Sequence, residues 1–468
     1  MKGKVVGSIR EAVALAGLKD GMTVSFHHHL RNGDYVLNLV MEAVAQLGIR
    51  DLTVNASSLF DIHLPLLDHI QSHVVTGIQT DYMSAALGRE ISRGILEKPV
   101  EFRTHGGRPS DIAQGRTPID VAFIAAPAAD PMGNCSGKYG KSACGSLGYA
   151  YPDAMYAKKV VVITDNLVDY PLLDWSIPES YVDYVVCVEE IGNPKGIVSG
   201  TTQITRDPVG LVMAQYAAKV IEHSGLLKDG MSFQTGAGGA SLAAAKYLKD
   251  IMLEKSIKGS YGLGGITSYM VDMLNAGCFE ALLDVQCFDL GAVESIRTNP
   301  RHREVTASHY ASPSVRSSAV DSLDVVILGA TQIDTDFNVN VHTDSNGYIM
   351  GGSGGHSDTA AGAKMAMIIA PLTRARLSIV VDRVLTVSTP GSTIDVLVTQ
   401  RGIAVNPRQQ ELKERLVKAG LPIVEIQDLK RIAEELTGTP KPIHLGDKVV
   451  ANVLYRDGSL LDTIKSVD

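Results

Sequence analysis

Short apolar runs alternate with amphipathic stretches along most of the 468-residue chain. Residues 36–46 and 241–252 carry apolar side chains at spacings of three and four residues, which predicts helices. Four short apolar runs predict buried strands, at residues 160–164, 182–188, 324–328 and 379–381. Helices and buried strands that alternate in this way are typical of a parallel α/β architecture.

The chain contains an internal repeat with a long period. Three segments recur about two hundred residues later in the same order, and the pairs are Leu18–Met22 with Leu227–Met231, Ile119–Ile124 with Leu323–Leu328, and Ala157–Ile163 with Ala363–Ile369. This period is too long for a solenoid, so it indicates two copies of one domain. We assign residues 1–215 to the first copy and 216–468 to the second, with the boundary in the helix and turn around residues 214–230.

The last part of the chain has a different pattern. Beyond Thr399, residues 409–418 and 428–436 predict charged helices, and a turn-rich stretch follows at 437–442. We expect this tail, from about residue 400, to be an appendage of the second copy. No low-complexity linker separates the copies. We therefore expect them to pack tightly, and such a junction is a common place for a ligand site.

The composition argues against several classes of protein. The chain is 45% hydrophobic and 20% charged, as expected for a large core, and its net charge of −8 argues against broad nucleic-acid binding. It has neither an apolar run long enough to span a membrane nor the apolar stretch of a secretion signal. The five cysteines form no CxxC pair, so we expect reduced core thiols in a cytoplasmic protein. The 45 glycines indicate turns where the backbone approaches another group closely.

The first of two glycine-rich turns is Gly236–Ser241, which follows a predicted strand and opens a predicted helix. An anion can bind to free N–H groups at such a helix N-terminus. A dinucleotide site would also need an acid at the tip of the next strand, but residues 261–265 contain none, so NAD is not expected. A tight turn without a ligand and an anion or acyl-thioester site remain the alternatives.

The second turn, Gly351–Asp358, is the densest glycine cluster of the chain. We predict a helix from Thr359, which Ser357 or Asp358 can cap. Free backbone N–H groups before it would form a nest suited to an oxyanion or a carboxylate, and His356 adds a donor. The alternative is a capped glycine turn that binds nothing.

A histidine-rich run, Phe26–Asp34, ends the first strand of the first copy and reads FHHHLRNGD. Three consecutive histidines cannot all face one metal ion because side chains alternate along a strand, so we predict no metal site. With Arg31, whose guanidinium fork matches a carboxylate, His27, His28 and His29 suit a polycarboxylate. Exposed turn residues without a ligand are the alternative.

Over nearly its whole length the sequence resembles the α subunit of bacterial citrate lyase, the citrate CoA-transferase component of the CoA-transferase superfamily. The resemblance rests on Gly17–Asn38, on residues 330–358 and on the segment Lys441–Lys448, which reads KPIHLGDK. The run HHHLRNGD within the first segment is specific, whereas the glycine motifs are shared across the wider superfamily.

The resemblance implies two tandem repeated open α/β domains of the NagB/RpiA/CoA-transferase-like type, with the active site between them and a short C-terminal tail. It also implies that acetate is exchanged for citrate on an acetyl-thioester acyl carrier protein. A partner subunit would cleave the resulting citryl thioester to oxaloacetate and acetyl thioester. The implied partners are the acyl carrier (gamma) and citryl lyase (beta) subunits, in a complex that contains a homo-oligomer of this chain. The carrier would bring a CoA-like prosthetic group, so no permanently bound cofactor is expected.

The sequence departs from the wider superfamily at one position. Enzymes similar to 4-hydroxybutyrate CoA-transferase have a nucleophilic glutamate in a His-Ser-Glu-Met context, and Gly265–Met270 matches that stretch with Tyr269 in place of the glutamate. A phenol substitutes poorly for a carboxylate that must form an acyl anhydride. We therefore expect direct attack of a citrate carboxylate on the thioester, with Tyr269 as a hydrogen-bonding group.

The resemblance also suggests roles for the remaining candidates. The superfamily turn Gly-Val-Gly-Gly-Gln-Val-Asp matches Gly352–Asp358, with His356 at the glutamine position. We expect three groups of residues: Gly354, Gly355, His356 and Tyr269 for catalysis; His27, His28, His29, Arg31 and Asn32 for citrate; and Gly236, Gly238, Gly239, Gly352, Ser353 and Asp358 for the thioester or its CoA-like arm.

Two other functions remain open on the sequence alone. The chain could be a CoA-transferase or acyl-CoA hydrolase for another short acid such as malonate, because malonate decarboxylase carries a comparable subunit. It could also be a silent scaffold within a lyase complex. The two retained glycine turns argue against the scaffold, which would not need open anion sites.

Overall fold

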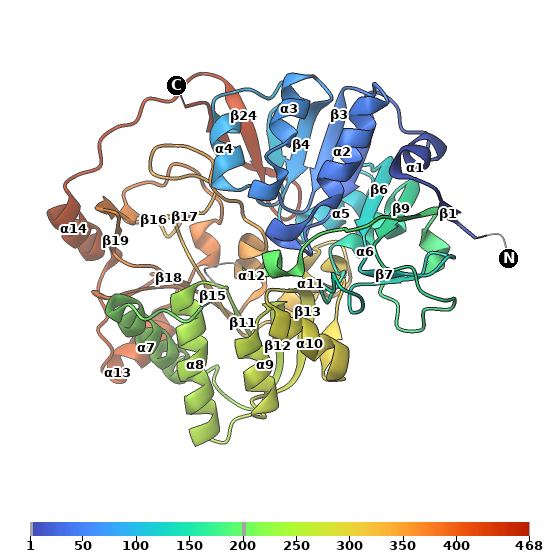
Figure 1. Ribbon diagram of the computed structural model, residues 1–468. Helices are drawn as coiled ribbons and strands as arrows, with labels where there is room; N and C mark the ends of the chain where they lie inside the picture. The colour runs from blue at the N-terminus through green and yellow to red at the C-terminus, as the bar shows by residue number, and fades with distance from the viewer. Residues whose placement is uncertain (1–2, 199–202, 468) are drawn as a thin grey trace.

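A computed structural model describes residues 3–198 and 203–467 of the chain and contains two large, mainly parallel sheets (Figure 1). The first sheet has ten strands, and every neighbouring pair is parallel except the last. In spatial order the strands are β1 (Val5–Val6), β10 (Tyr184–Cys187), β9 (Lys159–Thr164), β6 (Val121–Ala125), β2 (Thr23–Phe26), β3 (Leu52–Ala56), β4 (Val75–Thr80), β5 (Val100–Phe102), β24 (Val449–Leu454) and β25 (Leu460–Lys465).

The second sheet has eight strands, and only β22 and β23 pair antiparallel. Its spatial order is β14 (His302–Glu304), β13 (Phe279–Cys287), β12 (Gly259–Ile266), β11 (Phe233–Thr235), β15 (Val325–Leu328), β18 (Met365–Ile369), β22 (Val396–Thr399) and β23 (Gly402–Val405). Both sheets are flanked by helices, so the expected mixed α/β class with parallel sheets is confirmed.

The two sheets share a strand order. Strands β5-β4-β3-β2-β6-β9-β10 of the first sheet correspond in position and sequence order to β14-β13-β12-β11-β15-β18-β22 of the second. The repeated sequence segments fall on corresponding elements: one pair precedes β2 and β11, one lies on β6 and β15, and one leads into β9 and β18. Sequence repeat and strand order therefore agree.

The predicted helices are present. Residues 36–46 form α2, and residues 241–252 lie within α8 (Gly239–Glu254). The other α-helices of the described residues are α1 (Ile9–Leu15), α3 (Leu66–Gln71), α4 (Ala85–Ser92), α5 (Gly107–Ala113), α6 (Ala150–Tyr156), α7 (Pro208–His223), α9 (Ser268–Asn275), α10 (Leu290–Thr298), α11 (Ala307–Ala311), α12 (His356–Gly362), α13 (Gln410–Lys418) and α14 (Ile426–Thr437). Across residues 3–198 and 203–467, no helix combines the length and apolar character needed to cross a membrane.

Two local expectations are wrong. Helix α12 begins at His356, before the predicted start at Thr359, and Gly355 occupies its N-cap, so neither Ser357 nor Asp358 caps it. The predicted strand at residues 379–381 does not join a large sheet. Its last two residues form β21 (Val380–Val381), which pairs with β16 (Gln332–Asp334) beside β17 (Val339–Asn340) in a small separate sheet.

The tail contributes to both sheets: β23 belongs to the second sheet, whereas the hairpin β24–β25 joins the first. After α13 and α14, the chain returns along the upper part of Figure 1, and β24 pairs in parallel with β5. Ala451, Val453 and Ile464 of this hairpin are buried in the main core. The expectation of an appendage to the second copy is therefore wrong for this hairpin, because the backbone of β24 pairs with the otherwise open edge of β5.

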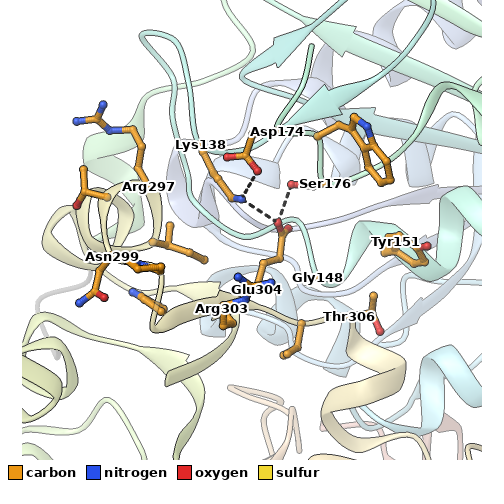
Figure 2. A pocket seen from close by; sticks show the side chains of 16 residues that line it. Lys138, Gly148, Tyr151, Asp174, Ser176, Arg297, Asn299, Arg303, Glu304 and Thr306 are labelled. Carbon is orange, nitrogen blue, oxygen red and sulfur yellow. Dashed lines mark hydrogen bonds and ion pairs between the residues drawn. The ribbon is translucent and has the colours of Figure 1, made fainter. Parts of the chain in front are cut away.

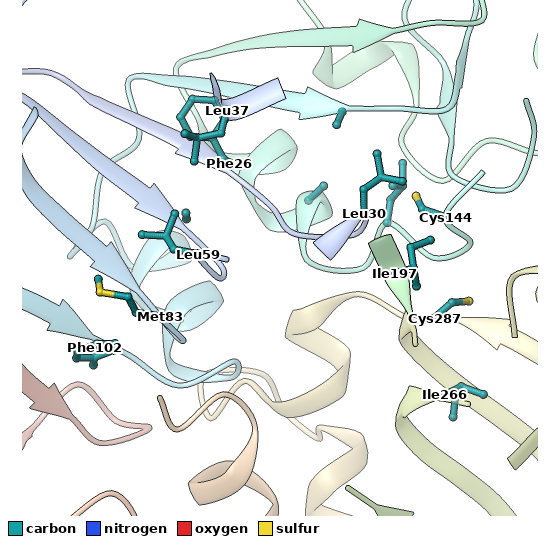
Figure 3. Close-up of a cluster of buried hydrophobic side chains, with 14 of the residues drawn as sticks. Phe26, Leu30, Leu37, Leu59, Met83, Phe102, Cys144, Ile197, Ile266 and Cys287 are labelled. Atoms are coloured by element: carbon teal, nitrogen blue, oxygen red, sulfur yellow. The ribbon is translucent and has the colours of Figure 1, made fainter. Parts of the chain in front are cut away.

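The larger of two clusters of buried apolar side chains extends through both sheets (Figure 3). Phe26 ends β2 of the first sheet and Leu30 lies in the turn after it, whereas Ile266 and Cys287 end strands of the second sheet. We call the surface along which the two sheets meet the seam. All five cysteines are free, and Cys187 is exposed whereas the other four are buried, so the expectation of core thiols is wrong for Cys187.

Candidate active site at the seam between the two sheets

The three histidines lie in the turn that follows β2, at the carboxyl end of the first sheet. All three side chains are buried, so the alternative that they are exposed turn residues is wrong. Nε2 of His27 accepts a hydrogen bond from the Ala125 amide at 3.0 Å. Burial lowers the pKa of His27 to about 4, so this ring is a neutral acceptor that holds the turn against β6.

His28 and His29 face the interior of the seam. His28 Nδ1 is 2.6 Å from Ser57 Oγ, and its ring lies 4.9 Å from the ring of Tyr149. Burial lowers the pKa of both histidines well below the usual value. Neither ring nitrogen of His29 has a hydrogen-bond partner in the described chain, although both are buried. Buried polar atoms are normally paired, so His29 can offer both a donor and an acceptor to a ligand.

The guanidinium of Arg31 lies over two aromatic rings. Its guanidinium carbon lies 4.6 Å from the ring centre of Phe288 and 5.5 Å from that of Phe60. Its Nη1 is buried without a hydrogen-bond partner among the described residues, and burial lowers the pKa of the side chain. The backbone of Arg31 has φ = 53°, a left-handed conformation that non-glycine residues rarely adopt outside strained or functional positions. Asn32 instead is exposed, and its Oδ1 accepts the Ile62 amide.

The glycine turn before α12 lies against the carboxyl ends of β4 and β5. The Gly354 amide donates to the Asp81 carbonyl at 3.0 Å, and the His105 amide donates to the Gly354 carbonyl at 2.8 Å. A Cβ atom on Gly352 would meet the backbone of Asp81, and one on Gly355 would lie 2.5 Å from Tyr310 Oη. Gly352 is therefore required for the close approach of the two sheets, and Gly355 for packing against Tyr310. The amides of Gly354 and His356 already donate hydrogen bonds within the protein, so they are not available to a ligand.

His356 and Asp358 both bond to protein groups. His356 Nδ1 lies 2.7 Å from Thr389 Oγ1, and its Nε2 lies 2.9 Å from the Gly329 carbonyl. Burial lowers the pKa of His356 to about 4. A direct contact with a thioester would require one of these bonds to break. Asp358 accepts hydrogen bonds from Thr104 Oγ1 and from the Gly106 amide, each at 2.8 Å, across the seam.

The other candidates lie further along the second sheet. Gly236 and Gly238 connect β11 to α8, with Gly238 at the N-cap, and the Gly236 amide donates to the Ile327 carbonyl at 3.0 Å. Tyr269 is half-buried in the first turn of α9. Within the described residues, no hydrogen bond or ring contact joins these groups to the histidine turn.

The structure adds a pair that sequence reasoning missed, Asp81 and His105. Asp81 Oδ2 lies 2.8 Å from His105 Nδ1, and the His105 ring lies 4.5 Å from the ring of Tyr149 and 5.7 Å from that of His28. Burial raises the pKa of Asp81, and the hydrogen bond from His105 opposes this shift. A Cβ atom on Gly354 would lie 3.3 Å from His105 Nε2. His105 therefore connects the histidine turn with the glycine turn.

A signal for this pair was present in the sequence. Asp81 directly follows β4, and His105 follows β5. Polar residues just beyond neighbouring parallel strands meet at one edge of a sheet, which is where open α/β sheets bind ligands. Among residues 3–198 and 203–467, no group of three or more His, Cys, Asp or Glu side chains is arranged to hold a metal ion.

A surface pocket of about 470 Å³ opens at another part of the seam (Figure 2). Lys138, Asp174 and Ser176 come from the first half of the chain, and Glu304 comes from β14. Glu304 accepts hydrogen bonds from the Leu147 amide at 2.6 Å and from Ser176 Oγ at 2.8 Å. Burial raises the pKa of Glu304, and these two bonds oppose that shift. The Glu304 carboxylate, which lines the pocket, thus connects the second half of the chain to the first by hydrogen bonds.

Comparisons with known proteins identify the family to which the chain is similar. The sequence model of the family "Citrate lyase, alpha subunit (CitF)" matches residues 2–467. Citrate lyase alpha chains of Klebsiella pneumoniae and Escherichia coli (strain K12) are 50% and 48% identical over 464 residues, which cover 99% of this chain and 91% of each relative. The alpha subunit of citrate lyase from Streptococcus mutans, solved in complex with citrate, is 48% identical with a TM-score of 0.98, over 100% of this chain and 92% of that chain.

A more distant structure shows the fold alone. The alpha subunit of malonate decarboxylase from Acinetobacter baumannii is 18% identical, with a TM-score of 0.68 over 94% of this chain and 93% of that chain. The malonate enzyme is thus similar in architecture, whereas the citrate lyase chains match in sequence over almost every element. The family model matches residues 2–467, and three relatives are 48–50% identical over 464 residues, which establishes the family of the chain. It belongs to the citrate lyase alpha-subunit family.

Proposed function

We propose that the chain exchanges acetate for citrate on an acetyl thioester carried by a partner protein. Arg31 is the observation that carries this proposal. Its guanidinium is packed between two aromatic rings, and Nη1 lacks a partner within the described chain. A buried charge without a counter-charge is costly, and the planar fork of arginine matches a carboxylate. A citrate carboxylate supplies that counter-charge.

The proposed chemistry needs no nucleophile from the protein. A carboxylate oxygen of citrate attacks the acetyl carbonyl carbon, a C–O bond forms, and the C–S bond breaks as the thiolate leaves with the electron pair. The product is a mixed anhydride of acetate and citrate. The thiolate then attacks the citryl carbonyl, a new C–S bond forms, and acetate departs. No proton or electron is consumed overall, so the protein contributes positioning and charge stabilisation.

His105 is suited to stabilise the oxyanion of these steps. Asp81 fixes the ring through Nδ1, which leaves Nε2 beside Gly354 in the glycine turn. When the imidazole is protonated, Nε2–H can donate to the oxygen on which negative charge develops. Asp81 holds the ring by its Nδ1, so that Nε2 keeps this direction during the reaction.

The glycine turns keep the roles that the family resemblance implies. We assign Gly236, Gly238 and Gly239 to the approach of the thioester's CoA-like arm, because the first amides of α8 have no carbonyl partner within the helix. We assign Gly352–Gly355 to the wall nearest the thioester carbonyl. His356 and Asp358 then position this turn through their bonds to Gly329 and Thr104, and Tyr269 lines the approach from α9.

We also propose the domain organisation and partners. The matching strand orders of the two sheets support two tandem copies of one open α/β CoA-transferase unit, with the hairpin β24–β25 inserted back into the first. The acyl carrier and citryl lyase subunits of a citrate lyase complex are the proposed partners, and the carrier brings the CoA-like group as part of the substrate. This chain then needs no resident cofactor.

A transfer assay tests the function directly. The purified chain is mixed with an acetyl thioester and citrate, and free acetate and citryl thioester are measured. We expect both products, in equal amounts and only when citrate is present. Acetate release with malonate or water but not with citrate would contradict the proposal. A silent scaffold would release no acetate with any acid.

A further inference from the structure

We infer that Gln286 recognises the hydroxyl group of citrate and so determines substrate specificity, an inference that rests on the proposed function. Gln286 lies near the end of β13 in the second sheet, and its Nε2 donates to the His28 carbonyl at 2.8 Å. Only 1% of the residue is exposed. The glutamine therefore reaches across the seam into the histidine turn.

The orientation of this amide is fixed. The His28 carbonyl can only accept a hydrogen bond, so the NH₂ end of the amide must face it. The oxygen Oε1 is then the free end, and it is buried without a hydrogen-bond partner among the described residues. A buried acceptor of this kind requires a donor, because leaving it unpaired costs free energy.

Gln286 belongs to the same site as Arg31. The His28 carbonyl that accepts from Gln286 Nε2 also accepts a hydrogen bond from the Arg31 amide at 2.9 Å. Phe288 stands two residues after Gln286, and its ring lies 4.6 Å from the Arg31 guanidinium carbon. The end of β13 and the residue after it thus bring an acceptor oxygen to the histidine turn and an aromatic ring to the Arg31 guanidinium.

Citrate matches this pairing of groups. Its three carboxylates are acceptors at neutral pH, so its single hydroxyl is the group that can donate to Gln286. Acetate and malonate have no hydroxyl and would leave Oε1 unpaired. Arg31 on a carboxylate and Gln286 on the hydroxyl would also fix the central carbon of citrate, so that only one of its two carboxymethyl arms reaches the thioester.

The test compares citrate with tricarballylate, which has the same three carboxylates but no hydroxyl. With the wild-type chain and an acetyl thioester, we expect kcat/KM for citrate to exceed that for tricarballylate by about 10- to 100-fold. In Gln286→Met this ratio should fall to near one. If kcat/KM falls by the same factor for both acids, the fall reflects the lost hydrogen bond to His28, and the ratio is unchanged.

Two further variants complete the test. Gln286→Glu keeps an acceptor oxygen but loses the donor to His28, so it should retain the preference for citrate at reduced activity. Gln234→Met removes another buried glutamine, whose Nε2 bonds to Tyr310 Oη at 3.0 Å, and should also keep the preference.

The outcomes are separable. Equal use of both acids by the wild-type chain overturns the role of Gln286, as does an unchanged ratio in folded Gln286→Met. A ratio that collapses in Gln234→Met alone would transfer the role to that residue and overturn the inference. Failure of the wild-type chain to transfer to citrate at all would instead contradict the proposed function.

Discussion

The carboxylate of Asp358, on helix α12, accepts a hydrogen bond from Thr104 Oγ1 at 2.8 Å across the seam. The same carboxylate accepts the Gly106 amide, and Arg456 Nε from the tail hairpin lies 3.6 Å away. Thr104 also pairs with Gly354 in a β-bridge. Elements of both sheets and of the tail thus converge on one buried acid, which holds the glycine turn in place.

Asp358 should make stability depend on pH. Burial raises its pKa from 3.8 to about 6, so between these values the native state binds a proton that the unfolded state has lost. The contribution of this carboxyl to the free energy of unfolding is therefore most favourable below pH 4. It decreases as pH rises to about 6 and is constant above that.

Denaturant unfolding of wild type and Asp358→Asn at pH 4.5 and 7 measures this effect. Between the two pH values, the wild type should lose on the order of 2 kcal/mol more than the variant. Other titrating groups cancel in the difference, because both proteins contain them. Parallel pH profiles would show that the carboxyl does not titrate in this window.

Gly355 should tolerate no side chain beside Tyr310. A Cβ atom would lie 2.5 Å from Tyr310 Oη, and the ring is buried and cannot move aside. We expect Gly355→Ala to lower the free energy of unfolding by about 1–3 kcal/mol. Tyr310→Phe in the same chain should restore part of that loss, although alone it removes the acceptor of Gln234. Strict additivity in this double-mutant cycle would contradict the contact.

Arg31→Lys should impair citrate use specifically. A lysine keeps the charge but loses the planar fork and its stacking on Phe60 and Phe288. We expect kcat/KM for citrate to fall by about 10- to 100-fold, mainly through KM. Arg374→Lys, at an exposed position on β19 (Thr373–Arg374), is the matched control and should behave as wild type. Equal activity of both variants would remove Arg31 from the site.

Asp81→Asn should slow turnover more than it weakens citrate binding. An amide can turn its NH₂ group toward His105 Nδ1, so the ring loses the fixed orientation in which Nε2 faces the developing oxyanion. We expect kcat to fall by about 100-fold while KM for citrate changes little. Asp169→Asn replaces an exposed aspartate and serves as the control. A rise in KM with unchanged kcat would point to a binding role instead.

Local patterns were sufficient to predict most elements. The apolar periodicity of residues 36–46 coincides with α2, and the runs at 160–164 and 324–328 lie within one residue of β9 and β15. Helices and buried strands of this kind are determined by their own apolar faces. The start of α12 was missed because Gly355 supplies its N-cap, a role that the sequence pattern favoured for Ser357 or Asp358.

The seam could be predicted only in part. The three histidines and Arg31 lie within five residues of one another, so a site that could bind a carboxylate was predictable from the sequence. Gln286 contacts His28 across 258 residues, and no local pattern specifies which strand ends meet. His356 has the residue type of a donor, but only the folded chain shows that Thr389 and Gly329 engage both nitrogens.

The hairpin β24–β25 has a consequence for synthesis on the ribosome. Residues 449–465 complete the first sheet, yet they are translated after every strand of the second. Until then, β5 is an open edge that can pair with the wrong strand of another nascent chain. Domains usually fold in the order in which they emerge. In this protein the first sheet is complete only after its last two strands have been translated. The parts of the seam that the two sheets contribute therefore reach their final structure at the same time.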